Sequence, residues 1–396
     1  MEAQDEILTL QNDSDETPIY WPVFHGNMAD DGKIFNLNIS TGTLKVDYTS
    51  ENRDHTVAYL GCAENASLNL KDSGILKITN PGTVFMFIDY ITLDKNKYPK
   101  LTMSGNSQFE IKQIKKILSD SPAFIFLASD ISLHGSSQFT LESSDLYLGD
   151  GNFNYCNINI CDDSVVNLSN NGIMLRSGID EVKTKLKEST VAMSGKSQLT
   201  VEVVGTVEKT QENNEVLKTN ISLNCDFFIT EYSNAMLKSH FIDIYNSNII
   251  LQDNAQMSIN SQKLKIRTDL DEKGQPLFDT NFTLKAGATS LNLNSIDGIH
   301  FPLNIHRENY PKGVFNFMAE GKENTGKVVI DVAPKDANAY GLNTLLRKNF
   351  TAINGKIVET GDQMKYFDFN YGKDIRNGNQ VGTITISLRN PHLKLS

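Results

Sequence analysis

Met103-Ser-Gly-Asn-Ser-Gln-Phe-Glu-Ile111 is the stretch that decides the fold, because near-copies of it follow further along the chain. They read Leu133-His-Gly-Ser-Ser-Gln-Phe-Thr-Leu141 and Met193-Ser-Gly-Lys-Ser-Gln-Leu-Thr-Val201. Self-similarity at a nearly even spacing is the sequence pattern of a repeat architecture. The phrase therefore predicts a stack of similar units.

Weaker copies extend the repeat in both directions. Three align without gaps and begin at Cys62, Ile160 and Leu251, and two degenerate copies begin at Leu223 and Leu284. Between the leading apolar positions (62, 103, 133, 160, 193, 223, 251 and 284) the steps are 41, 30, 27, 33, 30, 28 and 33 residues. We expect about eight units with a period of roughly 30 residues.

Apolar residues stand two apart on both sides of each turn, as Leu101 and Met103 do before one turn and Phe139 and Leu141 after the next. Alternation with a period of two is typical of a strand with one buried face, whereas a helical repeat needs apolar residues three and four apart. A third short strand follows in several copies, as at 173–175. Strand, turn, strand, turn, strand makes one coil. The predicted fold class is therefore all-β, a right-handed parallel β-helix (β-solenoid).

Two positions in the turn have a physical role. We expect one of them to point inward where two sheets meet, because six of the copies place a small residue there: Ala66, Ser107, Ser137, Ser164, Ser197 and Ala255. The position two places earlier holds residue types that tolerate the left-handed backbone of a sharp corner. These are Gly105, Gly135, Gly195, Asp162 and Asp253. Ladders of Asn and Ser along the corners are expected to link coil to coil by hydrogen bonds.

The phrase divides the chain into three parts. Residues 56–300 carry the copies and are predicted to form the parallel β-solenoid. Residues 1–55 have no clear copy and are expected to form an amino-terminal cap. Residues 301–396 contain strand-like runs such as Val328-Val-Ile-Asp-Val332 and are expected to form a strand-rich carboxy-terminal capping region. Caps are needed because an uncovered end of a stack leaves a sheet edge unpaired.

Composition narrows the classes of partner. The formal net charge is −11, with 37 Lys and Arg against 48 Asp and Glu, which disfavours a phosphate backbone, so no nucleic acid is expected. No apolar run approaches the roughly 20 residues that span a bilayer, so we expect no transmembrane segment. The amino terminus, MEAQDEILTLQNDSDE, does not have the pattern of a secretory signal peptide.

Asp162 and Asp163 are the only residues that the sequence suggests for catalysis, because β-helical enzymes acting on polysaccharides often use paired carboxylates. The alternative interpretation is a turn, since the same two positions are filled by Gly105 and Asn106 in another copy. Glycoside cleavage needs two carboxylates about 5 to 10 Å apart in a cleft. The spacing along the chain does not decide between the two interpretations.

No cofactor and no metal is predicted. The seven histidines have no paired metal-ligand spacing, and the chain has no glycine-rich nucleotide motif and no calcium-binding nonapeptide of the β-roll type. The four cysteines are too few and too irregularly spaced for a disulfide framework, so we interpret them as buried or turn thiols. They are Cys62, Cys156, Cys161 and Cys225.

The alternating phrase with a Gly-Asn or Gly-Ser corner, followed by a strand-rich terminal region, resembles the β-helical passenger domains of bacterial autotransporters and related adhesins. The resemblance covers roughly residues 56–300 and carries over no active-site residue. It implies a secreted or bacterial cell-surface protein that binds host cells, other bacteria or glycans without catalysis. The implied partners are a cell-surface protein or glycan, together with self-association through the solenoid faces.

Other functions stay open at this stage. A carbohydrate-active β-helix enzyme, a polysaccharide lyase or glycoside hydrolase similar to a phage tailspike, is the main alternative, and it would use the acidic corner at Asp162 and Asp163. A phage-associated fibre component and an effector delivered by a dedicated machine are further options. The remaining hypothesis is a structural spacer that displays another element at its end.

Overall fold

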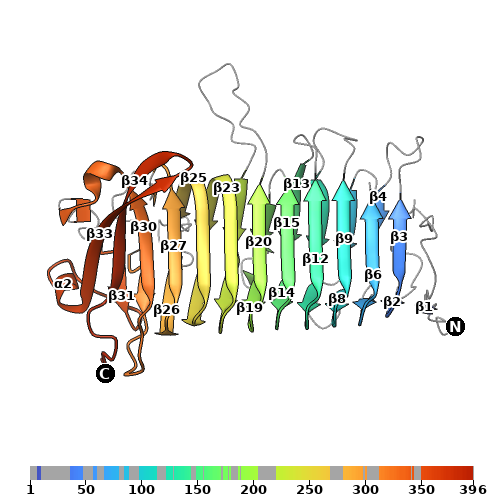
Figure 1. The fold of residues 1–396 in the computed structure, drawn as a ribbon, viewed down its shortest axis with the longest axis horizontal. Helices are drawn as coiled ribbons and strands as arrows, with labels where there is room; N and C mark the ends of the chain where they lie inside the picture. The colour runs from blue at the N-terminus through green and yellow to red at the C-terminus, as the bar shows by residue number, and fades with distance from the viewer. Residues whose placement is uncertain are drawn as a thin grey trace, which may run out of the picture. The chain divides into compact units, whose positions relative to one another are not determined.

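The computed structural model confirms the expected class, because the chain is nearly all β and forms a parallel β-solenoid (Figure 1). It describes residues 7–9, 36–47, 57–59, 67–79, 84–88, 98–113, 122–127, 129–143, 149–154, 156–170, 173–176, 178–179, 186–187, 189–203, 220–267, 280–297, 299–300, 312–339, 341–342 and 349–395. The chain forms two compact units. Unit 1 contains residues 1–192 and 196–219, and unit 2 contains residues 193–195 and 220–396.

Unit 1 contains three columns of parallel strands, and one strand from each column in turn makes a coil. The first column is β1 (Ile7–Thr9), β2 (Asn36–Ile39), β5 (Ser67–Leu70), β8 (Lys100–Met103), β11 (Asp130–Leu133), β14 (Asn157–Ile160) and β19 (Thr190–Met193), whose last residue belongs to unit 2. The second is β3 (Thr43–Asp47), β6 (Ile75–Thr79), β9 (Gln108–Gln113), β12 (Gln138–Ser143), β15 (Val165–Asn170) and β20 (Gln198–Val203). The third is β4 (Val57–Tyr59), β7 (Val84–Ile88), β10 (Pro122–Leu127), β13 (Gly149–Asn154) and β16 (Ile173–Arg176). A short antiparallel pair, β17 (Gly178–Ile179) and β18 (Leu186–Lys187), follows β16.

Unit 2 has the same parallel plan with longer strands, and its last strands are antiparallel. Its first column is β22 (Asp226–Ile229), β24 (Asn248–Asp253), β26 (Asn281–Gly287), β29 (Phe315–Phe317) and β31 (Thr351–Ile353), with β32 (Lys356–Ile357) antiparallel to β31. Its other parallel strands are β21 (Asn220–Asn224), β23 (Asn234–Tyr245), β25 (Gln256–Arg267), β27 (Ser290–Ser295), β28 (Ile299–His300) and β30 (Lys327–Val332). An antiparallel hairpin of β33 (Phe367–Arg376) and β34 (Asn379–Leu388) joins β30 through β34. Its described helical elements include η2 (Pro334–Asp336) and α2 (Gln363–Tyr366).

The core is built from every second side chain of each strand, stacked directly on its equivalent in the next coil. In the first column Leu101 lies opposite Ile131, and Ile131 lies opposite Ile158, and all three side chains are buried. In the second column Phe109 stacks on Phe139 with ring centroids 5.2 Å apart. Burying an aliphatic or aromatic side chain stabilises a fold by about 1.5 to 3 kcal/mol, so one apolar stripe per strand is enough to hold the stack.

The two turn positions behave as the sequence predicts. The small residue is buried in every described copy, with 0% exposure at Ser107, Ser137, Ser164, Ser197 and Ala255. The residue two places earlier has a positive φ, which is 67° at Gly105, 70° at Gly135, 74° at Gly195, 59° at Asp162 and 63° at Asp253. The conformation of each corner therefore depends on two local residues, one with a left-handed backbone and a small one whose side chain points inward.

Two copies of the phrase were placed wrongly by the sequence. Ser67–Leu70 is the first strand of its coil and pairs with Lys100–Met103, so the copy that begins at Cys62 is not a corner copy, and Cys62 itself lies outside the described residues. The corner of that coil contains Asp72, with φ 48°. Likewise Leu223 lies within the strand β21, and the corner of that coil contains Glu231, with φ 59°, and the buried Ser233.

Parallel stacking is found on both sides of the limits expected at 55 and 300. The strand β2 pairs with β5 in parallel, and β29 and β31 continue the first column of unit 2. Separately, the number of coils differs slightly from the expected eight. Among the described residues, no helix has the length and apolar character that crossing a membrane requires.

Hydrogen-bonded polar side chains do link coil to coil, but they lie mainly on the outer faces of the strands. Asn69 donates to Asn38 at 2.8 Å, and in unit 2 Asn281 donates to Asn248 at 2.6 Å and Asn294 to Asn260 at 2.7 Å. Stacked identical amides satisfy each other as donor and acceptor, which accounts for the high asparagine content without a ligand.

Candidate functional site

The acidic corner of unit 1 is where the structure places both residues that the sequence suggested for chemistry. Asp162 and Asp163 are exposed on the turn between β14 and β15. The Oδ2 atom of Asp162 accepts a hydrogen bond of 2.8 Å from the backbone N–H of Gly135 in the neighbouring coil. The N–H of Asp163 donates to the carbonyl oxygen of Gly135 at 2.9 Å. Both residues therefore join this corner to the one beside it.

The same connection recurs at other acidic corners. In unit 2 the Oε2 atom of Glu231 accepts a hydrogen bond of 2.7 Å from the N–H of Gly195, and Asp253 accepts a longer one of 3.4 Å from the N–H of Glu231. A carboxylate in the left-handed position thus caps the peptide N–H of the preceding corner. This recurrence gives Asp162 a structural role that is independent of any substrate.

The corners on either side of Asp162 and Asp163 supply no further carboxylate. The equivalent residues are Gly135 and Ser136 in one neighbouring coil, and Lys196, whose N–H donates to the carbonyl oxygen of Asp162 at 2.6 Å, in the other. A catalytic role for the two aspartates stays a prediction. Within the described ranges, no group of three or more His, Cys, Asp and Glu side chains is arranged to hold a metal ion.

Three of the four cysteines lie where the sequence predicts, either buried or in a turn. Cys156 and Cys225 are buried, and Cys161 is partly exposed beside the acidic corner. Burial raises the pKa of the Cys156 thiol to about 12. The thiol donates to the carbonyl oxygen of Phe126 at 3.4 Å, so Cys156 is a packed side chain and not a nucleophile at neutral pH.

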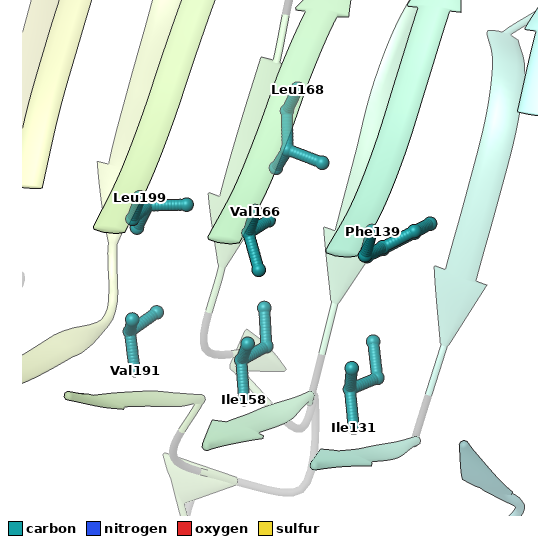
Figure 2. A pocket seen from close by; sticks show the side chains of 7 residues that line it. All are labelled: Ile131, Phe139, Ile158, Val166, Leu168, Val191 and Leu199. Atoms are coloured by element: carbon teal, nitrogen blue, oxygen red, sulfur yellow. The ribbon is translucent and has the colours of Figure 1, made fainter. Parts of the chain in front are cut away.

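An internal cavity of about 10 Å³ lies in the core of unit 1, lined only by apolar side chains. Figure 2 shows Val166 between Phe139 and Leu199, with Ile131, Ile158 and Val191 from the first column facing them. Val166 occupies the position equivalent to Phe109 and Phe139 in the two preceding coils, and its shorter side chain fills less of the core at that coil. A cavity of this size without polar partners does not hold a water well, and it is a packing defect rather than a ligand site.

An open groove of about 270 Å³ in unit 2 has the features of a binding site. Its apolar lining comes from Ile353, Ile357, Val358, Leu395 and the ring of Tyr366, and its polar lining from Asn354, Lys356, Glu359 and Asp362. Ligand sites typically combine an apolar wall with a few convergent polar groups. This set of residues, called the end groove below, is the strongest candidate site in the part of the chain that the structure describes.

Local geometry holds the end groove in place. Asn354 and Gly355 form the tight turn between β31 and β32, with φ 52° and 75°. The Asn354 side chain accepts a hydrogen bond of 2.8 Å from the N–H of Ala319 and donates to the carbonyl oxygen of Leu395 at 3.4 Å. The first bond ties the turn to the segment after β29, and the second ties it to the terminal segment that forms one wall.

The charged side chains on the groove wall differ in whether they already have an ion-pair or hydrogen-bond partner. Asp362 pairs with Lys365 at 2.5 Å, and Glu359 accepts a hydrogen bond of 3.2 Å from the side-chain amide of Asn349. The ammonium group of Lys356 has no ion-pair partner among the described residues. The groove thus offers a cation and two carboxylates, each with acceptor or donor capacity left for a ligand.

A buried ion pair fixes the hairpin of β33 and β34 to the rest of unit 2. The side chain of Asp331 on β30 is 0% exposed, and its Oδ2 atom accepts a hydrogen bond of 3.1 Å from Nε of Arg376. Arg376 also donates to Asn294 at 3.1 Å and to Asp374. Burial raises the pKa of Asp331, and the guanidinium of Arg376 opposes that rise.

Sequence reasoning missed the end groove entirely. Its residues come from β31, β32, α2 and the terminal segment, and none of them belongs to the repeated phrase. A local pattern that could have indicated a turn there is Asn354-Gly355, because Asn-Gly is a usual choice for a two-residue hairpin.

The structure also reveals two exposed aromatic side chains near one corner of unit 2. Phe228 on β22 is 39% exposed, and Tyr232 on the following turn is 66% exposed. Tyr232 lies at a corner position that is filled by Lys196 and Asn254 in neighbouring coils, whereas Phe228 pairs in register with the apolar Ile250.

The sequence and structure were also compared with known proteins. No protein-family model, no curated protein and no solved structure was found to match the chain.

Proposed function

We propose that the protein is a non-enzymatic, adhesin-like binding protein, secreted or displayed on a bacterial surface, which binds a cell-surface glycan in the end groove. The observation that carries this proposal is the combined lining of that groove, in which Tyr366, Ile357 and Leu395 provide apolar contact and Glu359, Asp362 and Lys356 provide hydrogen-bonding groups. Sugars present the same two kinds of surface, ring faces of C–H groups and rims of hydroxyl groups.

Each side of the groove has a defined task in this proposal. The Tyr366 ring and the Ile357 side chain, which is 42% exposed, pack against a sugar ring. The carboxylates of Glu359 and Asp362 accept hydrogen bonds from sugar hydroxyl groups, and Lys356 donates to an oxygen or to an acidic sugar. The rigid stack of strands holds these groups in position before the glycan arrives, which lowers the entropy cost of binding.

Glycan-array screening of the purified chain, followed by calorimetry on the best ligand, tests the proposal. We expect Glu359→Gln and Tyr366→Ala each to weaken binding about tenfold, which corresponds to the loss of one hydrogen bond or one ring contact. Tyr232→Ala is the matched control, because it removes an exposed tyrosine of the same unit outside the groove. No glycan binding, or equal affinity in all three variants, would contradict the proposal. Binding to a protein receptor alone would contradict the glycan part of it.

A carbohydrate-active enzyme is the second candidate, because Glu359 and Asp362 both line the end groove. Such an enzyme would use one carboxylate as acid and the other as base or nucleophile. Reducing-end and unsaturated-product assays on any polysaccharide that binds test this alternative. Product formation that disappears in Glu359→Gln and Asp362→Asn would place the chemistry in the groove, whereas disappearance in Asp162→Asn and Asp163→Asn would place it at the acidic corner.

A further inference from the structure

The strand β33 has one edge that no strand covers within the described part of the chain. It pairs with β34 on one side, over all ten residues from Phe367 to Arg376. Among the strands that the structure describes, no other pairs with it on the opposite side. A long unpaired edge is a template for another strand.

The backbone groups on that edge follow from the hairpin geometry. Asn377 and Gly378, with φ 48° and 79°, form a two-residue turn, and Arg376 and Asn379 flank it as a pair. In such a hairpin the flanking pair is hydrogen-bonded, and hydrogen-bonded pairs then alternate along the strands. The even-numbered residues of β33 therefore bond to β34. The odd-numbered residues point their N–H and C=O groups to the open edge.

Side chains along the open edge are accessible. Tyr371 is 42% exposed and Ile375 is 69% exposed, although both share a face with the buried Ile384 and Ile386 of β34. Lys373, between them, is also exposed. The N–H of Ile375 donates to the Asp374 carboxylate at 2.8 Å, and this bond is local and exposed, so it can be exchanged for a backbone acceptor. The edge is open to a partner along its central residues.

The sequence of β33 is complementary to itself about Gly372. Residues at equal distances on either side of this glycine are Tyr371 and Lys373, Asn370 and Asp374, Phe369 and Ile375, and Asp368 and Arg376. If the strand meets a second copy of itself antiparallel, with the two Gly372 residues opposite, each of these becomes a cross-strand pair. Two are apolar or cation–aromatic contacts, and one joins an amide to a carboxylate. The fourth sets opposite charges across from each other, Asp368, which also pairs with Arg389, and Arg376, which also pairs with Asp331.

Register supports the same arrangement. Pairing about Gly372 places odd residues opposite odd residues, so the free N–H and C=O groups of the two edges meet. Pairing about Tyr371 would also match the backbone groups, but it would set Asp368 opposite Asp374, and like charges directly opposite are destabilising. Charge therefore favours pairing about Gly372 over pairing about Tyr371.

We propose that the chain forms a twofold-symmetric homodimer in which β33 pairs antiparallel with β33 of a second copy, with Gly372 opposite Gly372. The interaction is isologous, since the same edge is used by both copies. One strand pair is a small interface, so the dimer is reversible and its population depends on concentration. This inference goes beyond the binding function and does not depend on any ligand.

Sedimentation velocity of the full chain at roughly 1 to 100 µM tests the dimer, a range that brackets a micromolar dissociation constant. Lys373→Pro removes an edge N–H without touching the bonds to β34, and proline is tolerated at such edge positions. We expect the wild type to shift from monomer to dimer with concentration, Lys373→Pro to remain monomeric, and the matched control Lys373→Gln to dimerise. A wild type that stays monomeric at about 100 µM would overturn the proposal, and so would Lys373→Pro dimerising as the wild type does.

Disulfide trapping tests the register and does not rely on the proline variant folding. Asn370→Cys and Asp374→Cys are prepared as separate single variants and then mixed under mild oxidation. Because these positions face each other only between copies, we expect the mixture to give a cross-linked dimer on a non-reducing gel. Each variant alone measures any background from native cysteines. The proposed register is wrong if the mixture yields no more dimer than the single variants do.

Discussion

Replacing Asp162 separates its role in the corner from any role in chemistry. The residue has a left-handed backbone with φ 59°, and its carboxylate accepts the N–H of Gly135 at 2.8 Å. Three substitutions change these two features in different combinations. Asp162→Asn keeps an acceptor, Asp162→Gly removes the acceptor but suits the backbone, and Asp162→Ala removes the acceptor and leaves a Cβ atom in a strained conformation.

The magnitudes follow from the two features. An L-residue other than Gly, Asn or Asp in the left-handed region costs about 1 to 2 kcal/mol. A single exposed hydrogen bond contributes about 0.5 to 1.5 kcal/mol. We therefore expect Asp162→Ala to lower the free energy of unfolding by about 2 kcal/mol. Asp162→Gly should lower it by less than about 1 kcal/mol, because relief of backbone strain offsets the lost bond. Asp162→Asn should lie close to the wild type.

Urea unfolding followed by circular dichroism measures the order of the three variants. Hydrogen exchange adds a local readout, because the Gly135 amide should lose protection in Asp162→Gly and Asp162→Ala and keep it in Asp162→Asn. Equal stability of the glycine and alanine variants would refute the backbone argument. Unchanged protection of the Gly135 amide in all three would refute the hydrogen-bond argument.

Two further predictions concern the core and the buried ion pair. Val166→Ile adds one methylene beside the cavity of unit 1 and should raise the free energy of unfolding by up to about 0.8 kcal/mol. The control Val201→Ile changes a buried site that does not line the cavity and should give no gain. The denaturant midpoints of the two variants test this difference. Arg376→Met leaves the Asp331 carboxylate buried without a cation and should destabilise unit 2 by about 3 kcal/mol at pH 8. Because burial raises the pKa of Asp331, the carboxyl group becomes protonated as the pH falls, so the loss should be smaller at pH 4.5, and equal losses at the two pH values would contradict this reasoning.

Much of the fold could be predicted because the repeat encodes it locally. The inward serines and the left-handed corner residues were found from single positions of the phrase, and Ser137 and Gly135 show both features in one turn. The two misplaced copies show where this reasoning fails. Asp72 and Glu231 hold the left-handed position without glycine, so the phrase that contains them is harder to recognise, although the backbone is the same.

The candidate site could not be predicted in the same way. The end groove depends on the turn at Asn354, the short helix α2 and a terminal segment meeting in space, and these lie up to 41 residues apart along the chain. The acidic corner, by contrast, was visible in the sequence, but its hydrogen bond to Gly135 was not.

The sequence by itself determined the parallel β-solenoid. Its apolar residues alternate along each strand and its corner repeats, so each coil can bury its alternate apolar side chains only by stacking on the next coil. Only the tertiary structure decided how unit 2 ends. There the parallel stack gives way to the antiparallel hairpin of β33 and β34, held by Arg376 against the buried Asp331. No repeat encodes that change of direction. It depends on the contact between Arg376 and Asp331, which are 45 positions apart and stabilise the hairpin only after folding has brought them together.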